Sequence, residues 1–400
     1  MPSQIKTPPS WLIQNARLAA GQTGWLLVSG RKISSLSQEA PGDCLIEAAG
    51  GVVDAAGANL LPGLIDLHTH GGMGREVMDA DPDGLAELSA FYASHGVSAF
   101  LATTWAAEPQ AVSAVLDTVK AAQTRGLPGA RLLGVHLEGP YLNPTRGGAQ
   151  DPARITPADL AQAETWLSSG LVRLVTLAPE IEQNLALARR CVELGVRVSA
   201  GHTDASYEQM RAAQRAGINQ VTHTFNAMSP FNHRAPGAAG AALELPGLFC
   251  EVIADLVHVH PAALRLLYRM RGADELILVS DSIRAAGLPD GRYPIGPGDP
   301  REIIVTDGAA RLQDGTLAGS TLTLEKALLN LQTATGRPLN ELWPAASRTP
   351  ARALGLQKTG ELLPGFRADL TLLDDSGTVL LTAVDGQVVF AAPGLRLQGF

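Results

Sequence analysis

The chain has 400 residues, of which 46% are hydrophobic and 18% are charged, a composition typical of folded globular proteins and not of disordered ones. The formal net charge of −8 argues against a nucleic-acid partner, because binding to a phosphate backbone needs a basic surface. The sequence has three cysteines without paired spacing, no signal-peptide pattern and no apolar run long enough for a membrane span. We therefore expect a cytoplasmic protein with no membrane partner.

Short apolar segments separated by Gly and Asn turns fill residues 11–60 and predict a small β-rich module. The segment 44–55 (CLIEAAGGVVDA) is expected to contribute to this module in extended form. Similar segments return over 368–390, where Asp-Ser-Gly and Asp-Gly turns separate them. We expect the two terminal pieces to pair with each other.

Between these pieces, strands alternate with amphipathic helices. Eight strands are predicted, at 61–68, 97–104, 131–138, 171–178, 196–202, 219–225, 251–258 and 275–281. Helices are predicted at 82–95, 108–125, 157–169, 183–195, 206–216 and 261–271, with a further one near 322–335. Eight strand–helix units favour a (β/α)8 barrel of the TIM type. The open doubly wound alternative is weaker, because no Gly-x-Gly-x-x-Gly turn follows the first strand.

Polar residues gather at the carboxyl ends of the predicted strands. In the first strand, Asp66, His68 and His70 stand at every second position and project to one face. The later strands end in His136 and Glu138, His202, His223, His258 and Asp281. In a barrel, residues at this end of every strand meet at one mouth even when they are distant in sequence.

Imidazole and carboxylate groups gathered at one mouth match the ligand set of a divalent ion such as zinc, iron, cobalt or manganese. His136 faces the same side as Glu138 but lies deeper, so a buried, hydrogen-bonded role fits it as well as a functional one. We do not count His136 among the ligands.

Several segments together resemble the N-acetylglucosamine-6-phosphate deacetylases of the amidohydrolase superfamily. They are LPGLIDLHTH (61–70), HLEGPYLN (136–143), GHTDAS (201–206), THTFNAM (222–228), LVSDS (278–282), LAGSTLTLEKAL (317–328), ASRTPARALGL (346–356) and GELLPGFRADLTLLD (360–374). The resemblance implies an α/β protein in which a (β/α)8 barrel over 61–357 carries a small β-sandwich built from both chain ends, 1–60 and 358–400. It also implies a homodimer.

By the same resemblance, Glu138, His202 and His223 correspond to the three protein ligands of the main catalytic metal. His68 and His70 correspond to positions at which some relatives bind a second metal, with Glu138 able to bridge the two. The expected cofactor is one or two divalent ions per subunit, zinc first and iron, cobalt or manganese as alternatives.

The implied reaction is hydrolysis of the acetamide of N-acetylglucosamine 6-phosphate to glucosamine 6-phosphate and acetate. A metal-activated water attacks the carbonyl, and Asp281 accepts its proton and delivers it to the leaving amine. No Gly-x-Ser-x-Gly elbow is present, so direct attack by water is favoured over an acyl-enzyme.

Contacts to the phosphorylated amino sugar are expected from Gln150, Asn226, Ala227, Arg234 and His258. Gln150 stands where many relatives have a histidine, and its amide can donate a hydrogen bond but cannot carry a proton. Arg234 lies in a loop bounded by Gly and Pro and offers phosphate a planar fork of donors. Because a loop residue of dimeric relatives reaches the partner's site, Arg234 acts either in its own subunit or across the interface.

Three other functions stay open from the sequence alone. An N-acetylgalactosamine-6-phosphate deacetylase would differ only in the epimer that it accepts. Dihydroorotase-like or deaminating amidohydrolases often bridge two metals with a carboxylated lysine on the fourth strand, but 171–178 contains no lysine. A non-catalytic barrel would be free to lose Glu138, His202, His223 and Asp281, and all four are present.

Overall fold

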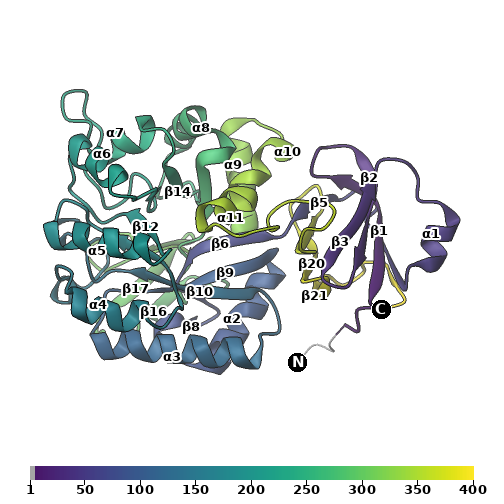
Figure 1. The fold of residues 1–400 in the computed structure, drawn as a ribbon, viewed down its shortest axis with the longest axis horizontal. Coiled ribbons are helices and arrows are strands. Elements are labelled where there is room, and N and C mark those ends of the chain that lie inside the picture. The colour runs from purple at the N-terminus through teal and green to yellow at the C-terminus, as the bar shows by residue number, and fades with distance from the viewer. Residues whose placement is uncertain (1–4) are drawn as a thin grey trace.

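The computed structural model describes residues 5–400 of the chain. Figure 1 shows a barrel covered by helices and, beside it, a smaller sheet at which both ends of the described chain, residues 5 and 400, lie. The strands of the two sheets come from different parts of the sequence, the barrel from its middle and the smaller sheet from its two ends.

Eight parallel strands form the barrel, in the order β6-β9-β10-β11-β12-β13-β14-β15. Their bounds are β6 Leu64–Thr69, β9 Val97–Thr104, β10 Arg131–Glu138, β11 Val172–Leu177, β12 Arg197–Ala200, β13 Gln220–Val221, β14 Phe249–Ile253 and β15 Leu276–Val279. The first and last strands lie side by side, and the amide of Asp281 donates a hydrogen bond of 2.8 Å to the carbonyl of His68. The predicted (β/α)8 barrel is confirmed.

Two strands were predicted to run too far. The sixth ends at Val221, and not at Phe225. The seventh strand ends at Ile253, and not at His258 as the sequence pattern indicated. The carboxylate of Asp255 accepts hydrogen bonds from the amides of Val257 and His258, at 2.9 and 2.8 Å. This Asx turn ends the extended chain, so His258 lies in the loop after the strand.

The helices pack around the barrel (Figure 1). Those that correspond to the predicted ones are α2 Pro82–Ser94, α3 Pro109–Arg125, α4 Leu160–Leu167, α5 Glu182–Glu193, α6 Tyr207–Arg215, α8 Pro261–Glu275 and α9 Leu324–Thr335. Besides α1, described below, three helices were not predicted: α7 Gly237–Glu244, α10 Leu339–Leu342 and α11 Arg348–Leu354. Six of the eight residues of α7 are buried, so that helix lacks the polar face by which an amphipathic helix is recognised.

The terminal segments form one nine-stranded sheet, as predicted. It contains β1 Ser10–Leu18, β2 Thr23–Ser29, β3 Lys32–Ser37, β4 Gly51–Asp54, β5 Asn59–Pro62, β19 Leu370–Leu373, β20 Val379–Val384, β21 Gln387–Ala391 and β22 Leu397–Gln398. The two chain ends meet where β5 pairs antiparallel with β19 and where β4 pairs antiparallel with β22.

Part of the segment 44–55 is not extended, which corrects the prediction. Residues Asp43–Ala48 form the short helix α1, and only Gly51–Asp54 form a strand. The strand partner β1 offers positions only to Gly51–Asp54, so the residues before them have no ladder of backbone hydrogen bonds to join.

A three-stranded insert between β15 and α9 was also not predicted. It consists of β16 Gly291–Pro294, β17 Glu302–Thr306 and β18 Ala309–Arg311. Its buried side chains, Ile303 and Val305 among them, pack in a cluster with Ala149 and against Trp105, both of which follow barrel strands. The insert therefore covers one side of the barrel mouth.

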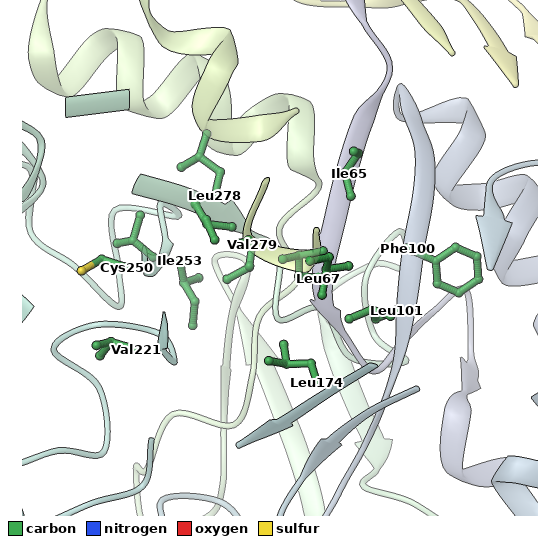
Figure 2. Close-up of a cluster of buried hydrophobic side chains, with 14 of the residues drawn as sticks. Ile65, Leu67, Phe100, Leu101, Leu174, Val221, Cys250, Ile253, Leu278 and Val279 are labelled. Atoms are coloured by element: carbon green, nitrogen blue, oxygen red, sulfur yellow. The ribbon is translucent and has the colours of Figure 1, made fainter. Parts of the chain in front are cut away.

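Apolar side chains of the barrel strands and of the surrounding helices pack in one large buried cluster. Figure 2 shows Ile65, Leu67, Leu174 and Val279 in this cluster, and each of them is at most 1% exposed. Burying a side chain of this size stabilises the fold by about 1.5–3 kcal/mol. A separate apolar core holds the terminal sheet together.

Over residues 5–400, no helix is both long enough and apolar enough to cross a membrane.

A candidate two-metal active site at the barrel mouth

The predicted strand-end residues converge at the carboxyl edge of the barrel. Glu138 is the last residue of β10, while His202, His223 and Asp281 each stand two residues beyond the end of β12, β13 and β15. His68 lies within β6 and His70 directly follows it. Parallel strands bring all of these residues to the same edge, as the barrel topology requires.

Glu138, His202 and His223 form the first of two groups. The Nε2 atoms of His202 and His223 lie 3.1 Å apart, and each is 3.2 Å from Oε1 of Glu138. Three atoms this close cannot all be joined by hydrogen bonds, because two imidazole nitrogens and one carboxylate oxygen do not share enough protons. Ligands about 2.1 Å from a tetrahedral ion lie about 3.4 Å from one another, so this triangle fits a divalent cation.

His68, His70 and Asp281 form the second group. Oδ1 of Asp281 lies 3.4 Å from Nε2 of His68 and 3.2 Å from Nε2 of His70. Glu138 stands between the groups, because its Oε1 is 3.3 Å from His68 Nε2 and its Oε2 is 3.4 Å from His70 Nε2. Nε2 of His68 and both ring nitrogens of His70 are buried without a hydrogen-bond partner among the described residues. A second cation would give these buried nitrogens a partner.

The electrostatics of the cluster call for positive charge. Burial alone raises the pKa of Glu138, but the His68 ring and hydrogen bonds with His202 and His223 hold that pKa well below its ordinary value. Burial also opposes the charged form of His70, and contacts with Asp281 and Glu138 nevertheless raise its pKa to about 9. The carboxylates are thus ionised and attract positive charge. A divalent ion supplies that charge more effectively than a protonated imidazole does.

The backbone is strained where it presents these side chains. The φ angles of His202, His223 and Asp281 are 46°, 30° and 48°, a region that residues other than glycine seldom adopt. Such outliers cluster at functional sites, where the surrounding structure compensates for their cost. Each of the three residues lies two positions beyond the end of a barrel strand and lines the pocket at the mouth.

Neighbouring groups hold the ligand rings in place. Nδ1 of His202 donates a hydrogen bond of 2.8 Å to the backbone carbonyl of Arg146. Nδ1 of His68 lies 3.2 Å from Oε2 of Glu251. Contacts of this kind fix which ring nitrogen is free to bind a metal.

Next to the two groups is a pocket of ≈ 180 Å³. The predicted residues that line it are His70, Glu138, Gln150, His202, His223, Asn226, Ala227, His258 and Asp281. His68 is fully buried behind this lining. Arg234 is exposed and does not line the pocket of its own subunit, and its guanidinium contacts the ring of the neighbouring His233 at 2.8 Å.

His136 is a buried, hydrogen-bonded residue, which is one of the two roles that the sequence left open for it. Its ring is fully buried and its Nε2 lies 2.8 Å from the hydroxyl of Thr176, while Nδ1 lies 3.3 Å from that of Thr103. Burial holds the pKa of His136 well below its ordinary value, so the ring stays neutral.

His258 lies in the pocket wall although it does not end a strand. Its Nδ1 is 2.6 Å from Oδ2 of Asp255, the residue whose carboxylate also forms the turn before it. A carboxylate can only accept, so Nδ1 donates and Nε2 is left for a ligand in the pocket.

Sequence reasoning missed several residues of the site. The ring of Trp105 stacks on that of His70, with centroids 4.4 Å apart, and its Nε1 donates a hydrogen bond of 2.7 Å to Glu76. Trp105 directly follows a predicted strand, and this position could have indicated that it lies at the barrel mouth. Thr316, Leu317 and Gly319 reach the pocket from the loop between β18 and α9, whose packing no sequence period indicated.

Comparisons with known proteins place this architecture in a family. A model of the amidohydrolase family matches residues 59–389. N-acetylglucosamine-6-phosphate deacetylase of Bacillus subtilis (strain 168) is 38% identical over 375 residues, which cover 92% of this chain and 93% of that protein. N-acetylgalactosamine-6-phosphate deacetylase of Escherichia coli O157:H7 is 39% identical over 332 residues, or 82% of this chain and 87% of that protein. A solved mutant of N-acetyl-D-glucosamine-6-phosphate deacetylase from Mycobacterium smegmatis, in complex with N-acetyl-D-glucosamine-6-phosphate, superimposes with a TM-score of 0.88 at 33% identity, over 96% of this chain and 100% of that one.

Proposed function

The chain belongs to the amidohydrolase family, and on that premise we propose that it hydrolyses N-acetylglucosamine 6-phosphate to glucosamine 6-phosphate and acetate. The protein is a metal-dependent hydrolase of this family. The observation that carries the proposal is the pair of histidine–carboxylate groups that share Glu138 beside a pocket.

We assign the main ion to Glu138, His202 and His223, and a second ion to His68, His70 and Asp281. Zinc is the proposed metal, because imidazole and carboxylate donors suit it; iron, cobalt and manganese accept the same donors. When bound, such an ion polarises a carbonyl and lowers the pKa of a water to about 7.

Asp281 is the proposed general base and acid. Burial raises the pKa of its carboxyl, but His68 and His70 outweigh that effect and hold the pKa below its ordinary value, so the group is ionised at neutral pH. Its carboxylate accepts a proton from the water that attacks the acetamide carbon. The same proton passes to the nitrogen as the C–N bond breaks, which leaves acetate and the free amine.

Neither of the buried thiols competes as a nucleophile. Cys191 lies in α5, and burial raises the pKa of Cys191 and of Cys250 to about 12. A thiol with so high a pKa is protonated at neutral pH and attacks carbonyl groups poorly. Direct hydrolysis by water therefore remains the proposed route.

The sugar lies, in this proposal, against Asn226, Ala227, His258 and Gln150 in the pocket wall. Arg234 is the proposed phosphate ligand. Because Arg234 is exposed outside the pocket of its own subunit, we propose that it serves the site of a partner subunit in a homodimer.

Two assignments concern the whole chain. We propose a β-sandwich domain of residues 1–60 and 358–400 and a catalytic barrel of residues 61–357, in keeping with the separate apolar cores. We also propose a cytoplasmic location, because Cys44, Cys191 and Cys250 are all free thiols and suit a reducing compartment.

N-acetylgalactosamine 6-phosphate is the second candidate substrate, because relatives named for either epimer match the chain at nearly equal identity. The deciding experiment measures acetate and amine release by the zinc-loaded protein. It compares both phosphorylated epimers, and each sugar without its 6-phosphate. The proposal predicts that kcat/KM is highest for N-acetylglucosamine 6-phosphate and that a chelator abolishes turnover. If the protein turns over neither phosphorylated sugar, the proposal is contradicted.

A further inference from the structure

A buried carboxylate outside both metal-binding groups contacts one of their histidines. Glu251 lies on β14, next to β15 in the barrel sheet, and is fully buried. Its Oε2 lies 3.2 Å from Nδ1 of His68, which is fully buried as well. We propose that Glu251 is a positioning residue that prepares His68 to bind the second ion. The inference rests on the proposed function in that it takes His68, His70 and Asp281 as a metal site.

The two ring nitrogens of His68 face different groups. Nε2 lies 3.3 Å from Oε1 of Glu138 and 3.4 Å from Oδ1 of Asp281, without hydrogen-bond geometry to either. Nδ1 faces Oε2 of Glu251 at 3.2 Å, and a carboxylate oxygen accepts a hydrogen bond. The ring hydrogen is therefore held on Nδ1, and the lone pair of Nε2 points toward Asp281 and Glu138, where a metal ligand needs it.

The surroundings of Glu251 make its buried carboxylate costly. No lysine or arginine among the described residues pairs with Glu251, and its Oε1 has no hydrogen-bond partner in residues 5–400. A buried carboxylate is unfavourable without a nearby cation. A cation held at Nε2 of His68 would bring positive charge near this carboxylate and offset that cost, so the carboxylate and the cation would stabilise each other.

The contact acts on one site only. In the main group, Nδ1 of His202 is held by the backbone carbonyl of Arg146 and no glutamate is involved. The backbone carbonyl of Glu251 accepts a hydrogen bond of 2.8 Å from the amide of Thr224, and a side-chain replacement leaves this bond intact. Changing the side chain at position 251 thus tests the second site without cutting the backbone link to the first.

The test uses Glu251→Gln and Glu251→Ala in the full chain, loaded with zinc. Glu325→Gln is a matched control, because Oε1 of Glu325 contacts Nδ1 of His95 at 2.8 Å in a similar pair outside the site. Bound zinc per chain is measured by elemental analysis, and the affinity of each step by competition with a chelator. Thermal unfolding of the metal-free proteins reports on folding.

We expect two zinc ions in the wild type and in Glu325→Gln, and one in Glu251→Ala. Glu251→Gln keeps the shape of the contact but lets the amide donate to Nδ1, so we expect its second zinc to bind roughly 10–100-fold more weakly. Manganese-loaded wild type should show a spin-coupled pair by electron paramagnetic resonance, and Glu251→Ala an isolated ion. If Glu251→Ala does not fold, Glu251→Gln decides the question alone.

Wild-type affinity for both ions in the Glu251 variants overturns the inference, and so does equal weakening of both steps. A wild type that deacetylates its substrate with only one bound ion overturns it as well, while the proposed function stands. Conversely, the protein could bind a second ion that depends on Glu251 and yet have no deacetylase activity. That result supports the inference and refutes the proposed function.

Discussion

The side-chain amide of Gln150 donates a hydrogen bond of 2.7 Å to Oε2 of Glu138. Its orientation is fixed from the other side, because Oε1 accepts a hydrogen bond of 2.8 Å from the backbone amide of Ala106, which can only donate. Gln150 therefore orients the carboxylate that stands between the two candidate metal-binding groups. That it also contacts the sugar stays a prediction.

Replacing Gln150 with Ala should weaken zinc binding at the Glu138 site about 10–100-fold, because the carboxylate loses the partner that aims it. Gln150→Glu should weaken it further, since two carboxylates then face each other. Zinc affinity is measured by chelator competition, with Gln162→Ala as the control; the Gln162 amide accepts from the hydroxyl of Tyr141. Unchanged zinc affinity with a raised KM would restrict Gln150 to substrate binding.

Removing His202 or His223 should abolish tight metal binding and deacetylation together, because each supplies one of the three atoms of the proposed main metal site. Zinc content and turnover are measured on the same preparations. His260→Gln, a change at an exposed histidine, serves as the control. Turnover at the wild-type rate in metal-free protein would refute the assignment.

Asp281→Asn should separate chemistry from binding of the main ion. The amide keeps the size of the carboxylate but cannot accept a proton, so kcat should fall by at least roughly 10²-fold. The Glu138 site should keep its zinc, because Asp281 contacts the second group at His68 and His70. A kcat near that of the wild type would exclude Asp281 as the base, and loss of the main ion would show that the two roles are not separate.

Arg234→Ala should raise KM for the phosphorylated sugar far more than it changes residual activity on unphosphorylated N-acetylglucosamine. Arg269→Ala, a loss of another exposed charge, is the control. An equal loss on both substrates would give Arg234 a structural role.

Mixing subunits tests where Arg234 acts. A heterodimer of Arg234→Ala and Asp281→Asn subunits contains one site with both residues intact only if Arg234 reaches across the interface. Recovery of activity on mixing is therefore expected. No recovery, with exchange of subunits verified, would place Arg234 in its own site.

Glu76 should make the stability of the protein depend on pH. Burial raises its pKa from 4.5 to about 7, against the opposing effects of His70, Arg284 and Trp105. The folded state thus binds this proton more tightly than the unfolded state does, and the stability linked to it is lost as the pH rises from about 4.5 to about 7.

In Glu76→Gln the side chain does not titrate, so this pH-dependent loss of stability is absent. Relative to the wild type, its free energy of unfolding should improve by roughly 2 kcal/mol between about pH 5 and about pH 8. Urea unfolding of the zinc-loaded proteins at both pH values measures the change, and the exposed Glu87→Gln is the control. A difference between variant and wild type that does not change with pH would contradict the shifted pKa.

The sequence alone determined the barrel and the place of its mouth. The strands are recognisable because their apolar runs have the length and spacing of parallel strands, and His68, Glu138, His202, His223 and Asp281 stand at or beside their carboxyl ends. Parallel pairing brings these ends together whatever the loops do, so their convergence follows from topology. The terminal β module was predictable for a similar reason, from turn residues between short apolar segments.

Only the tertiary structure decided what surrounds the ligands. Glu251 and His68 are 183 residues apart in sequence, and their contact depends on how strands and side chains pack across the barrel. The turn made by Asp255 places His258 in a loop and not in a strand. The loop that brings Leu317 to the pocket has no hydrophobic periodicity that predicts where it packs. Periodicity reports which face of an element is buried. Which two buried side chains meet is set by packing between elements, and no local pattern in the chain encodes it.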